Sequence, residues 1–156
     1  MSLYAKLKGT GPSGYGYGTT AEEVASGLDL TGRHILLTGC NSGIGNATLD
    51  VLTHQGATVY GAARTEEKAQ TACAQADGDA IPVVCELSDL ESVVACAEDV
   101  ESRDEELDAI ICNAGIMALP KLQTKHGYEL QFFTNHVVHF ILVTGLLDAL
   151  APDGWL

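Results

Sequence analysis

Short apolar runs alternate with longer amphipathic stretches along most of the chain. Four runs of five or six residues stand between glycine or polar residues, at 34–38, 57–62, 81–85 and 107–112. Each is followed by a stretch with apolar residues at helical spacing, at about 44–54, 65–76, 89–102 and 128–150. Runs that are apolar on both faces are typical of buried parallel strands. The alternation predicts an α/β fold with a doubly wound parallel sheet, of which this chain holds an amino-terminal portion of about four strands.

The sequence also marks where elements and domains begin. Ser88 and Glu91 form a capping-box pattern for the helix that starts near 89. Residues 9–18 hold five glycines and a proline, a composition that excludes a regular element. We therefore expect a flexible lead-in with a short helix over 1–32. One domain follows over 33–156, incomplete at its carboxyl end.

The composition is that of a folded protein with an acidic surface. The 156 residues are 46% hydrophobic, enough to bury a core, and carry a formal net charge of -13. Such a charge repels nucleic acid backbones and anionic lipid, so neither is an expected partner. The five cysteines are odd in number, widely spaced and without a C-x-x-C pair. This pattern favours a reducing, cytoplasmic location over a disulfide framework or a zinc site.

The stretch 132–150 is long enough to cross a bilayer but is not expected to do so. It contains Asn135, His136, His139 and Asp148, and four polar groups in hydrocarbon would be costly. We interpret it as a buried helix and predict no membrane span. His136 and His139 lie three residues apart on one face of this helix. Because no third ligand accompanies them, the sequence predicts no metal site.

A glycine-rich loop stands between the first strand and the first long helix. It runs from Thr38 to Gly45 as TGCNSGIG. Glycines there permit a sharp turn, let a pyrophosphate approach the backbone amides and let the helix pack closely on the sheet. The positive end of the helix dipole adds a local anion site, so the loop predicts dinucleotide binding. A second glycine pattern, at Gly9, Gly11 and Gly14, has no strand before it and no helix after it, and is not expected to bind a cofactor.

The residue at the end of the second strand bears on the choice of cofactor. Proteins that bind NAD usually place an acid on the ribose 2′-OH, about 20 residues beyond the glycines. Here the sequence is Ala62-Ala63-Arg64. A guanidinium pairs with a 2′-phosphate, whereas an acid repels it, so we expect NADP(H) to be preferred over NAD(H). The alternative is that Arg64 is a solvated residue at the start of a helix.

Three motifs together resemble those of the short-chain dehydrogenase/reductase family. They are the T-G-x-x-x-G-x-G loop, Asn113-Ala114-Gly115 at the end of the fourth strand, and Asn135 in the long helix. The sequences TGCNSGIG, FTNH and HF are similar to those of retinol-dehydrogenase-like and WW-domain-oxidoreductase-like members. The resemblance runs from about 17 to 154. It implies a Rossmann-type fold and hydride transfer between a nicotinamide cofactor and an alcohol or carbonyl.

The resemblance also implies which residues hold the phosphates and the adenine. The loop residues that would hold the pyrophosphate are Gly39, Cys40, Asn41, Ser42, Gly43, Ile44 and Gly45. Arg64 would hold the 2′-phosphate. Glu86 and Leu87 would lie beside the adenine, where the family has aspartate and leucine.

Further roles follow from the same resemblance. Asn113, Ala114 and Gly115 would stabilise the sheet and flank the cofactor ribose. Asn135 would match the helix asparagine that holds a water in the family's proton relay. The helix around 128–150 would form the interface of a homodimer.

The residues that the family uses for proton transfer do not follow these motifs. The family places a serine after the fifth strand and, on the next helix, a tyrosine four residues ahead of a lysine. The chain ends at Trp155 and Leu156, where we expect that fifth strand to begin. One Tyr-x-x-x-Lys, formed by Tyr4 and Lys8, precedes the first strand, and we interpret it as a coincidence.

Three interpretations of the function stay open from the sequence. The first is an NADP(H)-dependent oxidoreductase domain that is inactive as this chain alone. The second is a nucleotide-binding or interaction module without turnover. The third is a fragment that needs a partner chain, because its fourth strand would otherwise be an exposed apolar edge.

Overall fold

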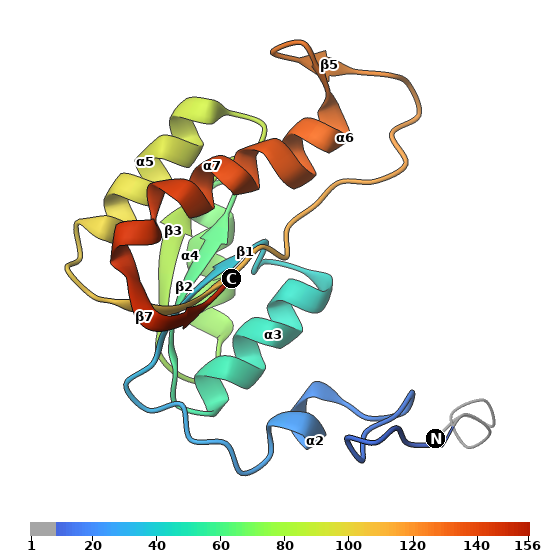
Figure 1. Ribbon diagram of the computed structural model, residues 1–156, viewed down its shortest axis with the longest axis vertical. Coiled ribbons are helices and arrows are strands. Elements are labelled where there is room, and N and C mark those ends of the chain that lie inside the picture. The colour runs from blue at the N-terminus through green and yellow to red at the C-terminus, as the bar shows by residue number, and fades with distance from the viewer. Residues whose placement is uncertain (1–8) are drawn as a thin grey trace.

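A five-stranded parallel sheet forms the centre of the computed structural model, which describes residues 9–156 (Figure 1). Its strands are β1 (His34–Thr38), β2 (Thr58–Ala63), β3 (Ala80–Val84), β4 (Leu107–Ile111) and β7 (Leu150–Trp155). Every pairing is parallel, in the order β3-β2-β1-β4-β7. The order reverses between β1 and β4, whose carboxyl ends therefore flank the crevice where open α/β sheets bind ligands. The predicted parallel sheet is confirmed, while Tyr4 and Lys8 lie outside the described residues.

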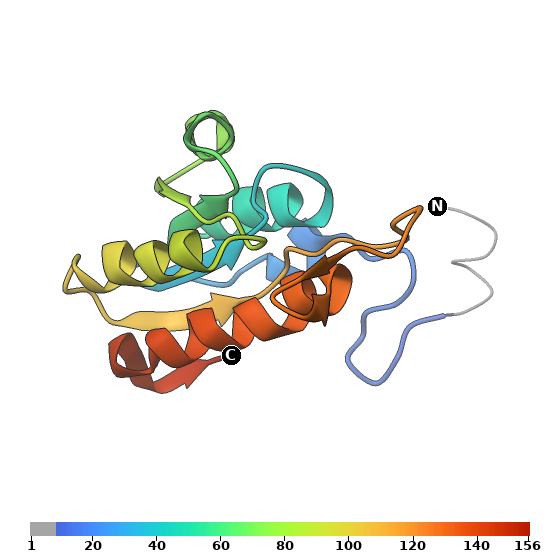
Figure 2. The same cartoon turned by 90° about the horizontal axis from the view of Figure 1, so that it is seen from above.

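Helices cover both faces of the sheet. α3 (Gly43–His54) and α4 (Glu66–Gln75) pack on one face, and α5 (Leu90–Glu101) and α7 (Val138–Gly145) pack on the other. Figure 2 shows α5 and α7 side by side. The shorter elements are α2 (Ala21–Ala25), β5 (Thr124–Lys125), β6 (Tyr128–Glu129), α6 (Leu130–Phe132), a π-helical turn (Phe133–Val137) and a 3-10 turn (Leu147–Ala149). Over residues 9–156, none of the helices combines the length and the apolar character that crossing a bilayer requires.

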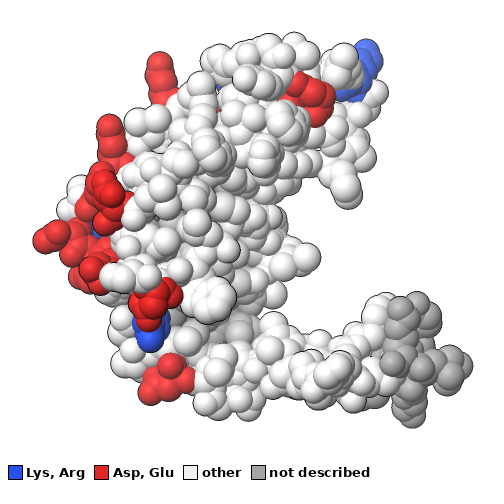
Figure 3. Space-filling model, viewed as in Figure 1, with Lys and Arg blue, Asp and Glu red and all other residues white. Residues whose placement is uncertain are grey.

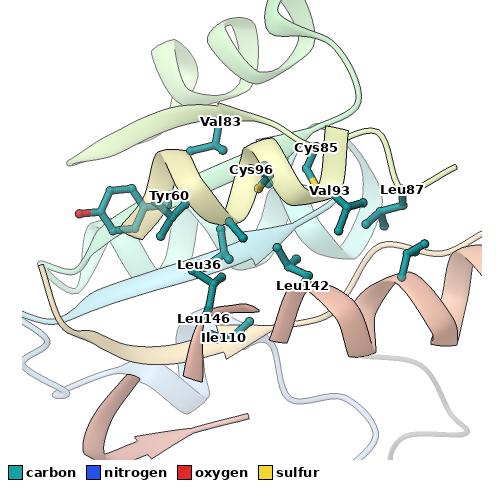
Figure 4. Packing of buried hydrophobic residues seen from close by; sticks show 14 of the residues in the cluster. Leu36, Tyr60, Val83, Cys85, Leu87, Val93, Cys96, Ile110, Leu142 and Leu146 are labelled. Atoms are coloured by element: carbon teal, nitrogen blue, oxygen red, sulfur yellow. The ribbon is translucent and has the colours of Figure 1, made fainter. Parts of the chain in front are cut away.

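Two hydrophobic layers hold the helices to the sheet. Successive residues of β1 point to opposite faces, so Leu36 packs with α5 and α7 whereas Leu37 packs with α3 and α4. Both leucines are fully buried. Figure 4 shows the first layer, where Leu36 and Ile110 of the sheet meet Val93 of α5 and Leu142 of α7. Burying a side chain of this size contributes about 2 kcal/mol, and the burial of β1 on both faces agrees with its apolar sequence.

The cap of α5 differs from the one expected. Asp89 is the N-cap residue, and its carboxylate accepts a hydrogen bond from the N–H of Glu91 at 3.2 Å. The Ser88 hydroxyl donates instead to the Glu86 carboxylate at 3.0 Å. Aspartate and serine both cap helices well, and here the helix begins one residue later, at Leu90. The capping box predicted from Ser88 and Glu91 is therefore wrong.

The prediction of a single helix over about 128–150 is wrong at both ends. His126 and Gly127 have φ values of 52° and 82°, which form the tight turn of the β5–β6 hairpin and delay the start of the helix. Over Phe133–Val137 the helix widens into a π turn, a feature that is frequent at functional sites. At the carboxyl end α7 stops at Gly145, a residue type that disfavours helix.

The fifth strand is present, which corrects the expectation that the chain ends where it would begin. Residues 150–155 form β7, which pairs with β4 and places Trp155 opposite Ala109. The register shifts along this pairing, and the strand contains Pro152, which has no N–H to donate, and Gly154. Since β7 covers the outer side of β4, that strand is not the exposed edge expected for a fragment.

A buried chain of hydrogen bonds ties α7 to the end of β1. The His139 ring is buried, with Nε2 3.0 Å from the Thr38 hydroxyl and Nδ1 3.2 Å from the Asn135 carbonyl. Because a carbonyl only accepts, Nδ1 carries the proton and Nε2 accepts from the Thr38 O–H. The Thr38 oxygen in turn accepts the N–H of Ala114 at 3.1 Å. All of these groups are partnered when the imidazole is neutral, and burial lowers the pKa of His139.

Acid should weaken the fold through His139. Burial holds the pKa of His139 in the folded chain below its unfolded value of about 6.5. The unfolded chain therefore binds the proton first, and stability present above about pH 6.5 is lost as the pH falls toward the folded pKa. We expect His139→Gln to lower the free energy of unfolding by about 1–3 kcal/mol at pH 8 and by less at pH 5.

Urea unfolding of the unaltered chain and of His139→Gln at both pH values measures the loss of stability. The contributions of the carboxylates are the same in the two chains and cancel. An equal loss of stability at both pH values would show that His139 is not the titrating group.

Candidate functional site

A cavity of about 430 Å³ opens at the carboxyl ends of β1, β2 and β4. Its walls come from the loop between β1 and α3, the junction of β2 and α4, the segment after β3, the segment after β4 and the π turn. The cavity lies where the strand order reverses. This is the place at which open α/β sheets bind their ligands.

The loop after β1 packs against the segment after β4 with no room for side chains. Gly39 has φ of 74°, in the left-handed region that favours glycine. A Cβ on Gly39 would stand 2.9 Å from the Cβ of Ala114. A Cβ on Gly45 would stand 2.5 Å from Asn113 Nδ2 and would overlap the Gly39 carbonyl oxygen. Glycine at these two positions lets the loop, the first turn of α3 and the end of β4 meet.

Side chains join the ends of β1 and β4 where their ladder ends. The Asn113 amide donates to the Thr38 carbonyl at 3.0 Å. The Thr38 hydroxyl accepts the N–H of Ala114. These bonds satisfy backbone groups that have no further strand partner. They hold the segment after β4 as a fixed wall of the cavity.

The first turn of α3 lines the cavity and has no side-chain cap. Ser42 is the N-cap residue, but its side chain makes no capping hydrogen bond within residues 9–156. Ser42, Ile44 and Gly45 all line the cavity, and no acidic residue lies in this turn. A helix of this length carries partial positive charge at its N-terminus, where its first N–H groups lack intrahelical partners. The turn can therefore hold an anion within the cavity.

Two cations stand at the side of the cavity formed by β2 and α4. Arg64 is exposed and directly follows β2, and Lys68 is half-buried in the first turn of α4. Both line the cavity. Sequence analysis identified Arg64 but missed Lys68, although the spacing of four residues would have indicated a shared side of the helix start.

The segment after β3 forms another wall and is tied to α5. The Glu86 carboxylate accepts the N–H and the hydroxyl of Ser88, each at 3.0 Å. The N–H of Glu86 donates to the Ser92 hydroxyl at 2.9 Å. Leu87 is buried beside it. These bonds fix the position of Glu86 and Leu87 at the cavity.

The cavity gathers most of the residues predicted from the sequence. Those that line it are Gly39, Asn41, Ser42, Ile44, Gly45, Arg64, Glu86, Leu87, Asn113, Ala114 and Gly115. Cys40 is fully buried in the core formed with α3 and α4, and Gly43 does not line the cavity. Asn135 supports the wall from behind, because its amide accepts the N–H of Ile116 at 2.8 Å and donates to the Ile116 carbonyl at 2.7 Å.

Sequence analysis missed further lining residues. They are Thr38, Ala63, Lys68, Cys85, Ile116 and Thr134. Thr38 is the first residue of the loop motif but was not assigned a binding role, and Ala63 directly precedes the predicted Arg64. Nothing in the local sequence indicated Cys85 or Thr134. The glycine pattern at 9–14 does not reach the cavity.

Most acidic side chains gather away from the cavity, and Glu86 is the one acidic residue among the described residues that line it. Figure 3 shows them along α5 and the loop after it, whereas the hollow between α3 and the segment after β4 shows none. The acidic residues of that stretch are Glu91, Glu98, Asp99, Glu101, Asp104, Glu105 and Glu106. Exposed charges are largely screened beyond about 10 Å in 0.1 M salt. The net charge of -13 therefore leaves the anion site at α3 effective.

Gly45→Ala should be destabilising, because the new methyl group would enter space held by Asn113 and the Gly39 carbonyl. We expect the free energy of unfolding to fall by about 1–3 kcal/mol or more, the usual effect of overpacking a rigid contact. Ala47→Ser, at an exposed position of the same helix, is the matched control and should change it by less than about 0.5 kcal/mol. Thermal unfolding followed by circular dichroism compares the three chains, and equal stability of all three would refute the contact.

The chain is similar to known proteins over most of its length. A family model described as short chain dehydrogenase matches residues 33–154. A short-chain dehydrogenase/reductase of Armillaria gallica is 42% identical over 133 residues, which cover 80% of this chain and 43% of that protein. Retinol dehydrogenase 14 of Mus musculus is 34% identical over 142 residues, covering 80% and 42%. The chain thus spans less than half the length of these relatives.

A solved structure has the same architecture. It is a metagenomic short-chain oxidoreductase in complex with NADP, with a TM-score of 0.67 and 25% identity, covering 77% of this chain and 57% of that one. The family match includes every strand that borders the cavity and almost all of β7. The sequence motifs, the sheet and the matched residues agree, and the chain belongs to the short-chain dehydrogenase/reductase family.

Proposed function

We propose that this chain binds NADP(H) in the cavity, as part of an oxidoreductase that transfers hydride between the cofactor and an alcohol or carbonyl. One observation carries the proposal. The uncapped first turn of α3 and the two cations Arg64 and Lys68 line a single cavity of about 430 Å³. Two anion sites in one cavity suit a molecule with two separate phosphate groups, the pyrophosphate and the 2′-phosphate of NADP(H).

An unpartnered hydroxyl also fits a polar occupant. Thr134 is buried and lines the cavity, and its Oγ1 has no hydrogen-bond partner within the described part of the chain. A buried hydroxyl left without a partner costs about 1–3 kcal/mol. A polar group of a ligand, or a water held by it, would remove this cost.

Each wall of the cavity is assigned to a different part of the dinucleotide. The loop from Gly39 to Gly45 and the first turn of α3 hold the pyrophosphate through backbone N–H groups. Glu86 and Leu87 lie beside the adenine, and Asn113, Ala114 and Gly115 flank the ribose. The fixed position of each wall supports this assignment, since little ordering of the chain would then oppose binding.

Asn135 acts as a positioning residue behind the cavity. Both polar atoms of its side-chain amide are engaged by Ile116, and its backbone carbonyl is a further acceptor. That carbonyl accepts the Nδ1–H of the His139 ring and has a second lone pair. We assign that lone pair to the water of the family's proton relay.

The preference for NADP(H) over NAD(H) comes from Arg64 and Lys68. A guanidinium forms paired hydrogen bonds with a phosphate, and an ammonium adds a second charge. The acid that would hold a free ribose 2′-OH is not found at the end of β2, where Ala63 precedes Arg64.

Binding without turnover is the expected behaviour of this chain alone. The nicotinamide supplies the carbon that accepts or gives the hydride, and the chain's own residues bind and orient it. The family's tyrosine and lysine must stand at that ring to move the proton. The sequence has one Tyr-x-x-x-Lys, at Tyr4 and Lys8, ahead of β1.

Arg64→Ala should weaken NADP⁺ binding far more than NAD⁺ binding, because only NADP⁺ has the phosphate that pairs with it. Loss of a charge-assisted hydrogen bond of about 1.5–3 kcal/mol raises the dissociation constant about 10- to 100-fold. Lys68→Ala should act in the same direction. Lys121→Ala removes the same charge at an exposed position outside the cavity and serves as the control. Calorimetric titration of each chain with both cofactors measures the effect.

The same titration tests the proposal as a whole. Equal affinity of the unaltered chain for NADP⁺ and NAD⁺ would refute the roles of Arg64 and Lys68. Absence of binding by a folded chain would refute the cofactor site. Turnover of NADP(H) with a panel of short alcohols and aldehydes, by a chain of verified mass, would refute the view that proton transfer needs a tyrosine and lysine beyond those present.

We also propose a homodimer formed through the helical segment around 128–150. Phe140 is 64% exposed and Leu147 is 49% exposed on this segment, and a second copy would cover them. Phe140→Glu should then lower the mass measured by light scattering from that of a dimer to that of a monomer. A monomer before the substitution would exclude this interface.

A further inference from the structure

Two buried cysteines contact each other where the segment after β3 meets α5. Val83 and Cys85 lie two residues apart and point to the same face of the sheet, toward α5. Cys96 is on the buried side of α5. Cys85 and Cys96 belong to the same buried cluster, and Figure 4 shows the two side chains next to each other. The bond from Glu86 to Ser92, one turn earlier on α5, holds the two elements in place.

The cavity connects this cysteine pair to solvent. Cys85 lines the cavity, although it is only 4% exposed, and Cys96 behind it is 1% exposed. Glu86 and Leu87, assigned above to the adenine side of the dinucleotide, directly follow Cys85. An occupant of that part of the cavity would therefore stand between Cys85 and solvent.

We propose that Cys85 and Cys96 form a site of reversible oxidation by peroxide, open through the empty cavity and closed by bound dinucleotide. The oxidation site is argued from the positions of the two thiols alone. Its protection by bound dinucleotide rests on the proposed function. Because only 4% of Cys85 is exposed, a small, neutral oxidant such as hydrogen peroxide suits this site.

The reaction balances in two steps. The Cys85 thiolate attacks the peroxide, an S–O bond forms as the O–O bond breaks, and the departing hydroxide takes up the proton that the thiol released. The Cys96 sulfur then attacks the sulfenic acid, so that an S–S bond forms and a second water leaves. The two thiols together lose two protons and two electrons, and one peroxide is reduced to two waters.

The contact between the thiols favours the first step at Cys85. The interaction between the two thiols lowers the pKa of Cys85 and raises that of Cys96. The thiolate is the nucleophile in thiol chemistry. The cysteine that lines the cavity is thus the one that ionises first, and its neighbour is placed to resolve the sulfenic acid.

A second thiol pair in the same chain provides an internal control. The sulfurs of Cys40 and Cys73 lie 3.2 Å and 2.7 Å from the point where a Cβ on Gly61 would stand, which brings the two thiols close together. Neither lines the cavity. Any cross-link in this pair should therefore form at a rate that does not depend on dinucleotide.

The experiment exposes the full chain to hydrogen peroxide with and without saturating NADP⁺. Peptide mapping without reductant then follows the Cys85–Cys96 cross-link over time. We expect the cross-link in the free chain, its reversal by dithiothreitol, and a rate about tenfold or more slower with NADP⁺ at 100 times its dissociation constant. Cys96→Ser should replace the cross-link by a sulfenic acid at Cys85 that dimedone labels. Cys112→Ser removes an exposed thiol outside both pairs and should change nothing.

The outcomes separate the two proposals. Absence of the Cys85–Cys96 peptide in a folded, oxidised chain would overturn the thiol site. A cross-link that forms equally fast with NADP⁺, when calorimetry shows that NADP⁺ is bound, would overturn access through the cavity. If calorimetry shows no binding, the cofactor proposal fails, while the cross-link in the free chain still decides the thiol site.

Discussion

The lack of a side chain at Gly45 is the constraint on which this structure depends. The first turn of α3 approaches the Gly39 carbonyl and the Asn113 amide so closely that only a hydrogen atom fits between them. That approach brings the end of β1, the start of α3 and the end of β4 to one point, where the strand order reverses. The cavity, the uncapped helix terminus and the bond from Ala114 to Thr38 all follow from this junction.

The fold could be predicted where burial leaves a local pattern of apolar residues. It could not be predicted where a segment becomes a strand only because it pairs with a distant strand. β1 is buried on both faces, so its residues are apolar in sequence and the strand was predicted with its observed bounds. β7 depends on its partner β4, and Pro152 and Gly154 weaken its own signal. The helical spacing of Leu142 and Leu146 continues to Leu150, which made the strand look like the end of a helix.

The candidate site shows the same division. The residues of the loop from Gly39 to Gly45 and of Asn113-Ala114-Gly115 are contiguous, so each motif could be recognised in the sequence alone. Thr134 and Cys85 reach the cavity because of how the π turn and the end of β3 align with β1. That alignment is a property of the packed sheet, and no local spacing encodes it.

The π turn at Phe133–Val137 lets the last helix present side chains in two different directions. A wider turn of this kind rotates the residues beyond it by about 100° relative to a regular α-helix. Thr134, in the turn, lines the cavity, whereas Leu142, beyond it, packs on the sheet. The Asn135 amide meets the backbone of Ile116 from the turn itself. One continuous helix can therefore serve as a wall of the binding site and as a cover for the core, two surfaces that a single straight stripe of side chains would not reach.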